Sequence, residues 1–111
     1  MWQQEKRMVV DNLICTDSIE HFGKDYILTV CMEKCAELIQ AISKTKREPD
    51  NTIWRDGVTE EIADAMICIE YLMQLYSVQE KEIQDKIDFK QDRTVKRMGE
   101  NANVKSGEES K

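Results

Sequence analysis

The sequence predicts an all-α fold, built as a bundle of four helices. Apolar residues recur every three or four positions over long stretches of the 111-residue chain, as they do along one side of an α-helix. One proline and four glycines leave few residues for the turns of a many-stranded sheet. No convincing stretch alternates apolar and polar residues with a period of two, so we expect no β-sheet.

The first two helices are expected in the N-terminal half of the chain. One runs from about Gln3 to Glu20, and His21-Phe22-Gly23 ends it, because glycine readily adopts the conformation that follows a helix C-terminus. The next runs from about Lys24 to Lys46. The segment from Arg47 to Gly57 is polar and contains a proline, so we expect a loop there.

Two further helices follow this loop. The third is expected from about Val58 to Tyr76, with Asp56 or Thr59 as its N-cap. The fourth spans about Val78 to Met98 and is more charged. Residues 99–111 lack apolar periodicity, which predicts a disordered polar tail. We therefore expect one helical domain over residues 1–98 and a tail over residues 99–111.

Composition excludes several classes of protein. The chain has enough residues for one modest core, and its 41% hydrophobic and 34% charged residues are typical of a helical soluble protein. A net charge of -6 argues against general nucleic-acid binding. No apolar run approaches the length of a membrane span and no signal-peptide pattern is present, so we expect no membrane association and a cytoplasmic location.

The four cysteines all lie in apolar helical contexts. Cys31 and Cys35 are four residues apart on one predicted helix, which is a poor geometry for a disulfide and does not match the usual zinc spacings. We expect Cys15, Cys31, Cys35 and Cys68 to be small buried apolar residues in a reducing compartment.

Two acidic pairs, Glu33 with Glu37 and Glu61 with Asp64, have spacings that place each pair on one side of a helix. At about 100° per residue, Glu61 and Asp64 fall within the apolar arc of their helix, and Glu37 falls at the edge of its own. Glu33 turns toward solvent. Lys34 turns inward, where a further acid would complete a ring of four.

Inward carboxylates need a cation, hydrogen-bond donors or a proton. Two helices that bring such acids together could hold a hard cation such as Mg²⁺. The alternative is that acids gather in the first turn of a helix because they complement its dipole. That alternative suits Glu60 better than Glu61 or Asp64, which turn inward.

The order of these motifs resembles the MazG-like all-α nucleoside triphosphate pyrophosphohydrolases, a group that includes the dimeric dUTPases and the dCTP pyrophosphatases. The resemblance covers about Phe22 to Arg97. It is carried by the segment Cys35–Lys44, by Glu60–Asp64, and by Asp88-Phe89-Lys90 together with Lys96-Arg97. The segment Cys35–Lys44 looks especially like small phage and Firmicute-type members.

The resemblance implies a four-helix MazG-like bundle. Because the second and third predicted helices are apolar over much of their circumference, we expect a homodimer or a homotetramer whose interface completes this bundle. The resemblance also implies Mg²⁺, or Mn²⁺ in its place, and hydrolysis of a (deoxy)nucleoside triphosphate to the monophosphate and pyrophosphate. When the family's motifs are matched to this sequence residue by residue, Glu37, Glu61 and Asp64 correspond to the metal-binding and catalytic acids. Lys34 stands where the family has the first glutamate of its first motif, and Glu33 matches the acid before it.

Three interpretations of Lys34 are open. Glu33 supplies the missing metal ligand, or the lysine ammonium itself lies among the acids, or the lysine contacts a substrate phosphate. The inward position of Lys34 favours charge substitution, which predicts weak binding of Mg²⁺ and Mn²⁺. The alternative function is therefore a non-catalytic nucleotide-binding or regulatory bundle of the same fold, and a structural helical adaptor comes third.

Further candidates for substrate binding are basic or aromatic. Lys44 at the end of the second helix, and Arg93 and Lys96 on the fourth, could contact phosphates, and Trp54 could stack on a base. Each has an alternative interpretation. Lys44 could complement the dipole at a helix C-terminus, and Arg93 and Lys96 could belong to a solvated helix face. Trp54 could be a loop residue that covers the core.

Overall fold

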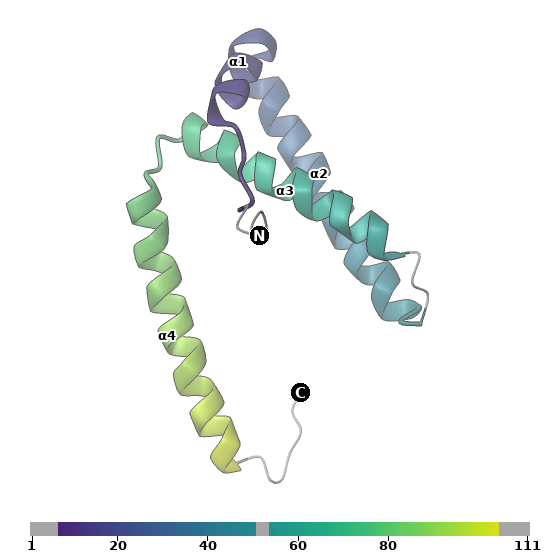
Figure 1. Cartoon of the computed structure of the whole chain (residues 1–111), viewed down its shortest axis with the longest axis vertical. Helices are drawn as coiled ribbons and strands as arrows, with labels where there is room; N and C mark the ends of the chain where they lie inside the picture. The colour runs from purple at the N-terminus through teal and green to yellow at the C-terminus, as the bar shows by residue number, and fades with distance from the viewer. Residues whose placement is uncertain (1–6, 51–53, 105–111) are drawn as a thin grey trace, which may run out of the picture. The chain divides into compact units, whose positions relative to one another are not determined.

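The computed structural model of the chain describes residues 7–50 and 54–104. Within these ranges it contains four helices and no strand, which confirms the predicted all-α class: α1 (Asn12–Phe22), α2 (Lys24–Arg47), α3 (Trp54–Leu75) and α4 (Glu80–Val104) (Figure 1). The chain divides into two compact units after Ser77, so α1, α2 and α3 form the first unit and α4 belongs to the second.

Helix α1 begins at Asn12, later than predicted. Asp11 has an extended backbone conformation, and its Oδ1 atom accepts hydrogen bonds from the backbone N–H groups of Leu13, at 2.9 Å, and Ile14, at 3.2 Å. These bonds satisfy N–H groups that have no partner inside the helix, so Asp11 is the N-cap. The prediction of a helix from Gln3 was therefore wrong over residues 7–11, and residues 3–6 lie outside the described residues.

The predicted break at Gly23 is confirmed. Its φ of 89° lies in the left-handed region that glycine adopts without strain, and its N–H donates to the Ile19 carbonyl oxygen at 2.8 Å. The chain turns there from α1 into α2, which runs one residue past its predicted end.

Helix α3 begins at Trp54, before its predicted start at Val58. Asp56 and Thr59 lie inside the helix, so the prediction that one of them is the N-cap was wrong. The Thr59 hydroxyl donates to the Arg55 carbonyl oxygen at 2.9 Å, one turn back, which a helix interior permits. Apolar periodicity locates the stretch that packs on the core, whereas the hydrogen-bonded helix extends beyond it. Of the predicted loop, residues 48–50 are not helical and residues 51–53 lie outside the described residues.

The first unit is a helical hairpin of α2 and α3, which lie side by side and run in opposite directions, with α1 packed against both (Figure 1). Its core is small: Ile27, Cys31 and Cys68 are buried, and the partly buried residues around them are Ile19, Tyr71, Leu72 and Leu75. Two side-chain hydrogen bonds of 2.8 Å tie α1 to α3, from the Tyr71 hydroxyl to Ser18 Oγ and from the Thr16 hydroxyl to Gln74 Oε1.

Three of the cysteines are buried as predicted, but Cys35 is exposed, so the prediction was wrong for that residue. The apolar arc of α2 is wider than the surface that α3 covers, and Cys35 lies on the uncovered part. The Cys31 thiol donates to the Cys68 carbonyl oxygen at 3.9 Å. Burial raises the pKa of the Cys68 thiol to about 12, so this side chain is neutral at physiological pH.

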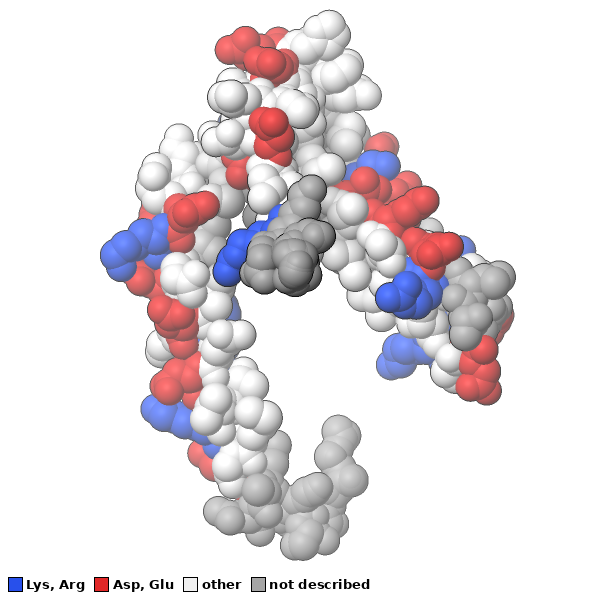
Figure 2. All heavy atoms as spheres, in the orientation of Figure 1, with Lys and Arg blue, Asp and Glu red and all other residues white. Residues whose placement is uncertain are grey.

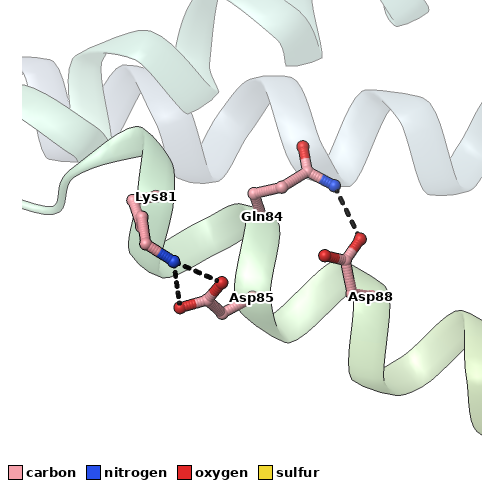
Figure 3. Close-up of polar contacts among 4 residues, drawn as sticks. All are labelled: Lys81, Gln84, Asp85 and Asp88. Carbon is pink, nitrogen blue, oxygen red and sulfur yellow. Dashed lines mark hydrogen bonds and ion pairs between the residues drawn. The ribbon is translucent and has the colours of Figure 1, made fainter.

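Helix α4 is charged along its length, with acidic and basic side chains interspersed (Figure 2). Its side chains pair one turn apart: Lys81 with Asp85 at 3.0 Å, and Gln84 with Asp88 at 2.9 Å (Figure 3). The helix continues to Val104, so residues 99–104 of the predicted tail are helical, and residues 105–111 lie outside the described residues. In the part of the chain that the structure describes, no helix is both long and apolar enough to cross a membrane.

Candidate functional site

The carboxylates of Glu37, Glu61 and Asp64 meet between α2 and α3. One oxygen atom from each lies within 4.8 Å of the other two. Glu37 comes from α2, and Glu61 and Asp64 lie three residues apart on α3, so the hairpin brings both predicted motifs together. We call these three residues the carboxylate cluster. Mutual repulsion makes such a cluster unfavourable unless positive charge or protons offset it.

Lys34 supplies positive charge to this cluster. Its Nζ atom lies 3.6 Å from Oδ2 of Asp64 and 3.7 Å from Oε1 of Glu37. The Asp64 carboxylate, and then that of Glu37, raises the pKa of the Lys34 ammonium. This geometry agrees with the interpretation that the ammonium lies among the acids. The Lys34 side chain is 37% exposed, so it keeps access to solvent on one side.

Glu61 is the member of the cluster that Lys34 does not reach in this structure. Its Oε1 atom is buried and accepts no hydrogen bond from the described residues. A buried carboxylate oxygen without a donor is costly, so this atom marks the place where a cation or a donor would be bound most favourably. The chemistry of the three carboxylates fits a hard divalent cation, which takes oxygen ligands.

Glu33 is exposed and does not belong to the cluster of acids that the described residues form. The structure therefore gives no support to the interpretation that Glu33 replaces the missing ligand. Lys34 is half-buried and Glu33 is exposed, as the helical wheel predicts.

Lys44 and Trp54 lie together where α2 leads into α3. The Lys44 ammonium is 5.1 Å from the centre of the Trp54 ring, and the Trp54 indole N–H donates to Glu48 Oε1 at 3.3 Å. Lys44 is seven residues beyond Glu37, which corresponds to about 10 Å along the helix. These contacts hold the hairpin end together, and binding of phosphate or base at this position stays a prediction.

Arg93 and Lys96 lie on α4 and interact within that helix. The Arg93 guanidinium is 5.5 Å from the centre of the Phe89 ring, and Lys96 Nζ is 3.3 Å from Asp92 Oδ2. Both side chains are exposed, as the solvated-face alternative requires.

Sequence reasoning missed an apolar groove in the first unit. It has a volume of about 580 Å³ and lies between residues 8–15 and α3, where Ile62, Met66 and Tyr71 contribute to its lining. The groove was missed because residues 8–11 were assigned to a helix. Asp11 could have indicated the true start of the helix, since an aspartate before an apolar helical run is a common N-cap.

Comparisons of the chain with models of protein families, with curated proteins and with solved structures found no match. The carboxylate cluster, with Lys34 paired to two of its members, is therefore the main structural evidence on function.

Proposed function

We propose that the chain is a MazG-like nucleoside triphosphate pyrophosphohydrolase, which hydrolyses a (deoxy)nucleoside triphosphate to the monophosphate and pyrophosphate. The observation that supports this proposal is the meeting of Glu37, Glu61 and Asp64 from two facing helices, with oxygen atoms within 4.8 Å of one another. The three acids are the ones that the resemblance assigns to the metal site, and they come from separate sequence motifs.

Glu37, Glu61 and Asp64 would hold Mg²⁺, or Mn²⁺ in its place. When bound, such an ion supplies charge neutralisation for the triphosphate and orientation of the attacking water. The buried Oε1 atom of Glu61 supports this assignment because it has no hydrogen-bond donor of its own among the described residues. The negative charge of the three carboxylates attracts a divalent cation and, in its absence, repels a triphosphate.

Lys34 changes what this site does. Its ammonium forms ion pairs with two of the three acids, Glu37 and Asp64, and thereby competes with a divalent cation for the same oxygen atoms. An ammonium can also donate to phosphate oxygens, so in this proposal Lys34 would turn from the acids to the substrate when a triphosphate binds. We therefore propose weaker metal binding than a site with a fourth acid would have.

A second function is favoured by the same lysine. If Lys34 stays paired with Glu37 and Asp64, the bundle binds a nucleotide and does not hydrolyse it. In this alternative the protein is a regulatory or nucleotide-binding module. Nucleotide binding with no product formation, in the presence of Mg²⁺ or Mn²⁺, would select it.

The test is pyrophosphate release from a panel of ribo- and deoxynucleoside triphosphates, with Mg²⁺ and with Mn²⁺. We expect release from at least one nucleotide and its loss in Glu61→Ala. Glu33→Ala is the matched control, because Glu33 is an exposed acid on the adjoining helix outside the cluster. Equal activity in Glu61→Ala and the unmodified chain would contradict the proposed site.

The assembly and the cellular location also belong to the proposal. We propose a homodimer or a homotetramer that works in the cytoplasm. Extensive apolar exposure on α2 and α3 supports association, since Met32, Ile39 and Ile69 are each more than half exposed in the single chain.

A further inference from the structure

Cysteine supplies most of the fully buried side chains of the first unit. Among the described residues, the buried apolar side chains are Cys15, Ile27, Cys31 and Cys68, each 2% or 3% exposed. A buried thiol usually serves as a small apolar residue. Cys31 on α2 and Cys68 on α3 have a further property, because these two residues are in direct contact across the hairpin.

The contact between Cys31 and Cys68 crosses from one helix to the other. The Cys31 thiol donates to the Cys68 carbonyl oxygen, and the sulfur atom is 3.9 Å from that oxygen. Burial, and then the hydrogen bond of its thiol to Cys31, raises the pKa of Cys68 to about 12. The two thiols therefore face each other inside the surface at which α2 and α3 pack.

Helix packing brings two such residues within reach of a disulfide. Packed helices have axes about 8–10 Å apart, and Cα atoms lie about 2.3 Å from their axis. Residues that face each other across the contact thus have Cα atoms roughly 4–6 Å apart, and a disulfide joins Cα atoms about 4.4–6.8 Å apart. Cys31 and Cys35 are less suitable, because Cβ atoms four residues apart on a helix are about 5–6 Å apart and a disulfide holds them at about 3.8 Å.

We propose that Cys31 and Cys68 are a redox-sensitive pair, which oxidised glutathione or a similar small disulfide converts into a disulfide between α2 and α3. The sulfur–sulfur bond of glutathione breaks as the Cys31–Cys68 bond forms. Glutathione accepts the two electrons and the two thiol protons, and leaves as two molecules of its reduced form. This modification is independent of the proposed hydrolysis.

Burial makes the oxidation slow and ties it to opening of the hairpin. A thiolate attacks a disulfide, and burial raises the pKa of both Cys31 and Cys68. The reaction therefore proceeds when α2 and α3 separate transiently and the thiols meet solvent. The small core of the first unit, with few buried side chains, makes such opening accessible.

The disulfide stabilises the first unit and holds α2 against α3 beside the carboxylate cluster. Cys31 and Cys68 are 37 positions apart in the sequence, so a bond between them closes a long loop and lowers the entropy of the unfolded chain. Cys31 precedes Lys34 by three residues and Cys68 follows Asp64 by four, so the bond lies about one helical turn from the ion pair of those two residues. The stability of the hairpin thus depends on the redox state.

The first test is incubation of the full chain with oxidised glutathione under native conditions, followed by peptide mass spectrometry without reduction. We expect the Cys31–Cys68 linkage to exceed every other intrachain linkage at least ten-fold. The same incubation in urea is the control and should remove this preference. Glutathione adducts of Cys35 without a Cys31–Cys68 linkage, or equal amounts of several linkages under native conditions, would overturn the proposal.

Cys35→Ser separates the buried pair from the exposed thiol. Cys35 is exposed, so its replacement should leave the fold intact. The Cys31–Cys68 linkage should form in this variant to the same extent as in the unmodified chain. Its absence would show that the oxidation depends on Cys35 and would count against the pair.

A comparison of the oxidised and reduced forms of the unmodified chain gives a readout that needs no variant. The oxidised form should unfold at a urea concentration roughly 1–3 M higher than the reduced form. Equal midpoints, with the linkage present, would contradict a disulfide that joins facing residues of the native hairpin.

The disulfide and the proposed enzyme fail separately. Glu61→Ala removes a cluster acid and should leave the yield of the Cys31–Cys68 linkage unchanged. The linkage without pyrophosphate release would support the pair and contradict the enzyme. Pyrophosphate release without the linkage would support the enzyme and contradict the pair.

Discussion

The Nζ atom of Lys34 lies 3.6 Å from Oδ2 of Asp64, so a lysine on α2 pairs with an acid on the facing helix α3. The same ammonium is 3.7 Å from Glu37 Oε1. A positive charge thus lies beside two of the three acids that would otherwise bind a divalent cation. This competition should weaken the binding of a divalent cation.

Replacing Lys34 with glutamate should strengthen metal binding. Lys34→Glu removes the competing ammonium and adds a fourth carboxylate, so we expect the affinity for Mg²⁺ and Mn²⁺ to rise at least ten-fold over weak binding by the unmodified chain. Calorimetric titration measures the affinity of each protein for Mg²⁺ and for Mn²⁺. Lys44→Glu is the control, since it makes the same change of charge on the same helix outside the cluster. Tight metal binding by the unmodified chain would contradict this account.

The core of the first unit should be sensitive to loss of volume at Ile27. This side chain is 2% exposed and packs in a core of few buried residues. Ile27→Ala should cost about 2–4 kcal/mol of the free energy of unfolding, measured with urea. Val95→Ala, at an exposed position, should stay within about 0.5 kcal/mol. A similar loss in both variants would show that Ile27 is not a core residue.

The contribution of the α1 N-cap to the free energy of unfolding should be measurable. Asp11→Ala removes the side-chain acceptor for the N–H groups of Leu13 and Ile14 and should cost about 1 kcal/mol. Asp17→Ala, at an exposed position within the same helix, is the control and should cost less. If the two variants unfold at the same urea concentration, α1 does not begin where the structure places it.

Stability should fall at alkaline pH through the buried thiols. The pKa of Cys68 rises from 9.0 to about 12 on folding, so the unfolded chain loses this proton first as the pH increases. The contribution of the thiol is therefore complete below pH 9.0 and is lost progressively as the pH rises toward 12. Urea unfolding at pH 8 and pH 11 should show a smaller decrease for Cys68→Ala than for the unmodified chain. Equal decreases would contradict burial of the thiol.

The sequence was most informative where burial follows helical periodicity. The wheel placed Lys34, Glu61 and Asp64 inward and Glu33 outward, because a regular helix of 3.6 residues per turn fixes these directions. It could not show which acids Lys34 reaches, since that depends on how α2 and α3 pack. The exposure of Cys35 escaped prediction for the same reason: an apolar arc does not reveal how much of it a neighbour covers.

Helix ends were less predictable than helix faces. The Asp11 side chain accepts hydrogen bonds from backbone N–H groups of α1 and so fixes where this helix begins. The helix begins there even though apolar residues such as Met8 and Val9 continue the periodic pattern before it. At Trp54 the opposite holds, because the helix extends past the apolar repeat into a segment that contains Gly57.

The most direct test of the central claim is quantification of nucleotide products from the full chain with Mg²⁺. The account predicts equal amounts of nucleoside monophosphate and pyrophosphate from at least one triphosphate, with both lost in Glu61→Ala and retained in Glu33→Ala. Diphosphate and inorganic phosphate as products, no product from any triphosphate, or undiminished product from Glu61→Ala would contradict it.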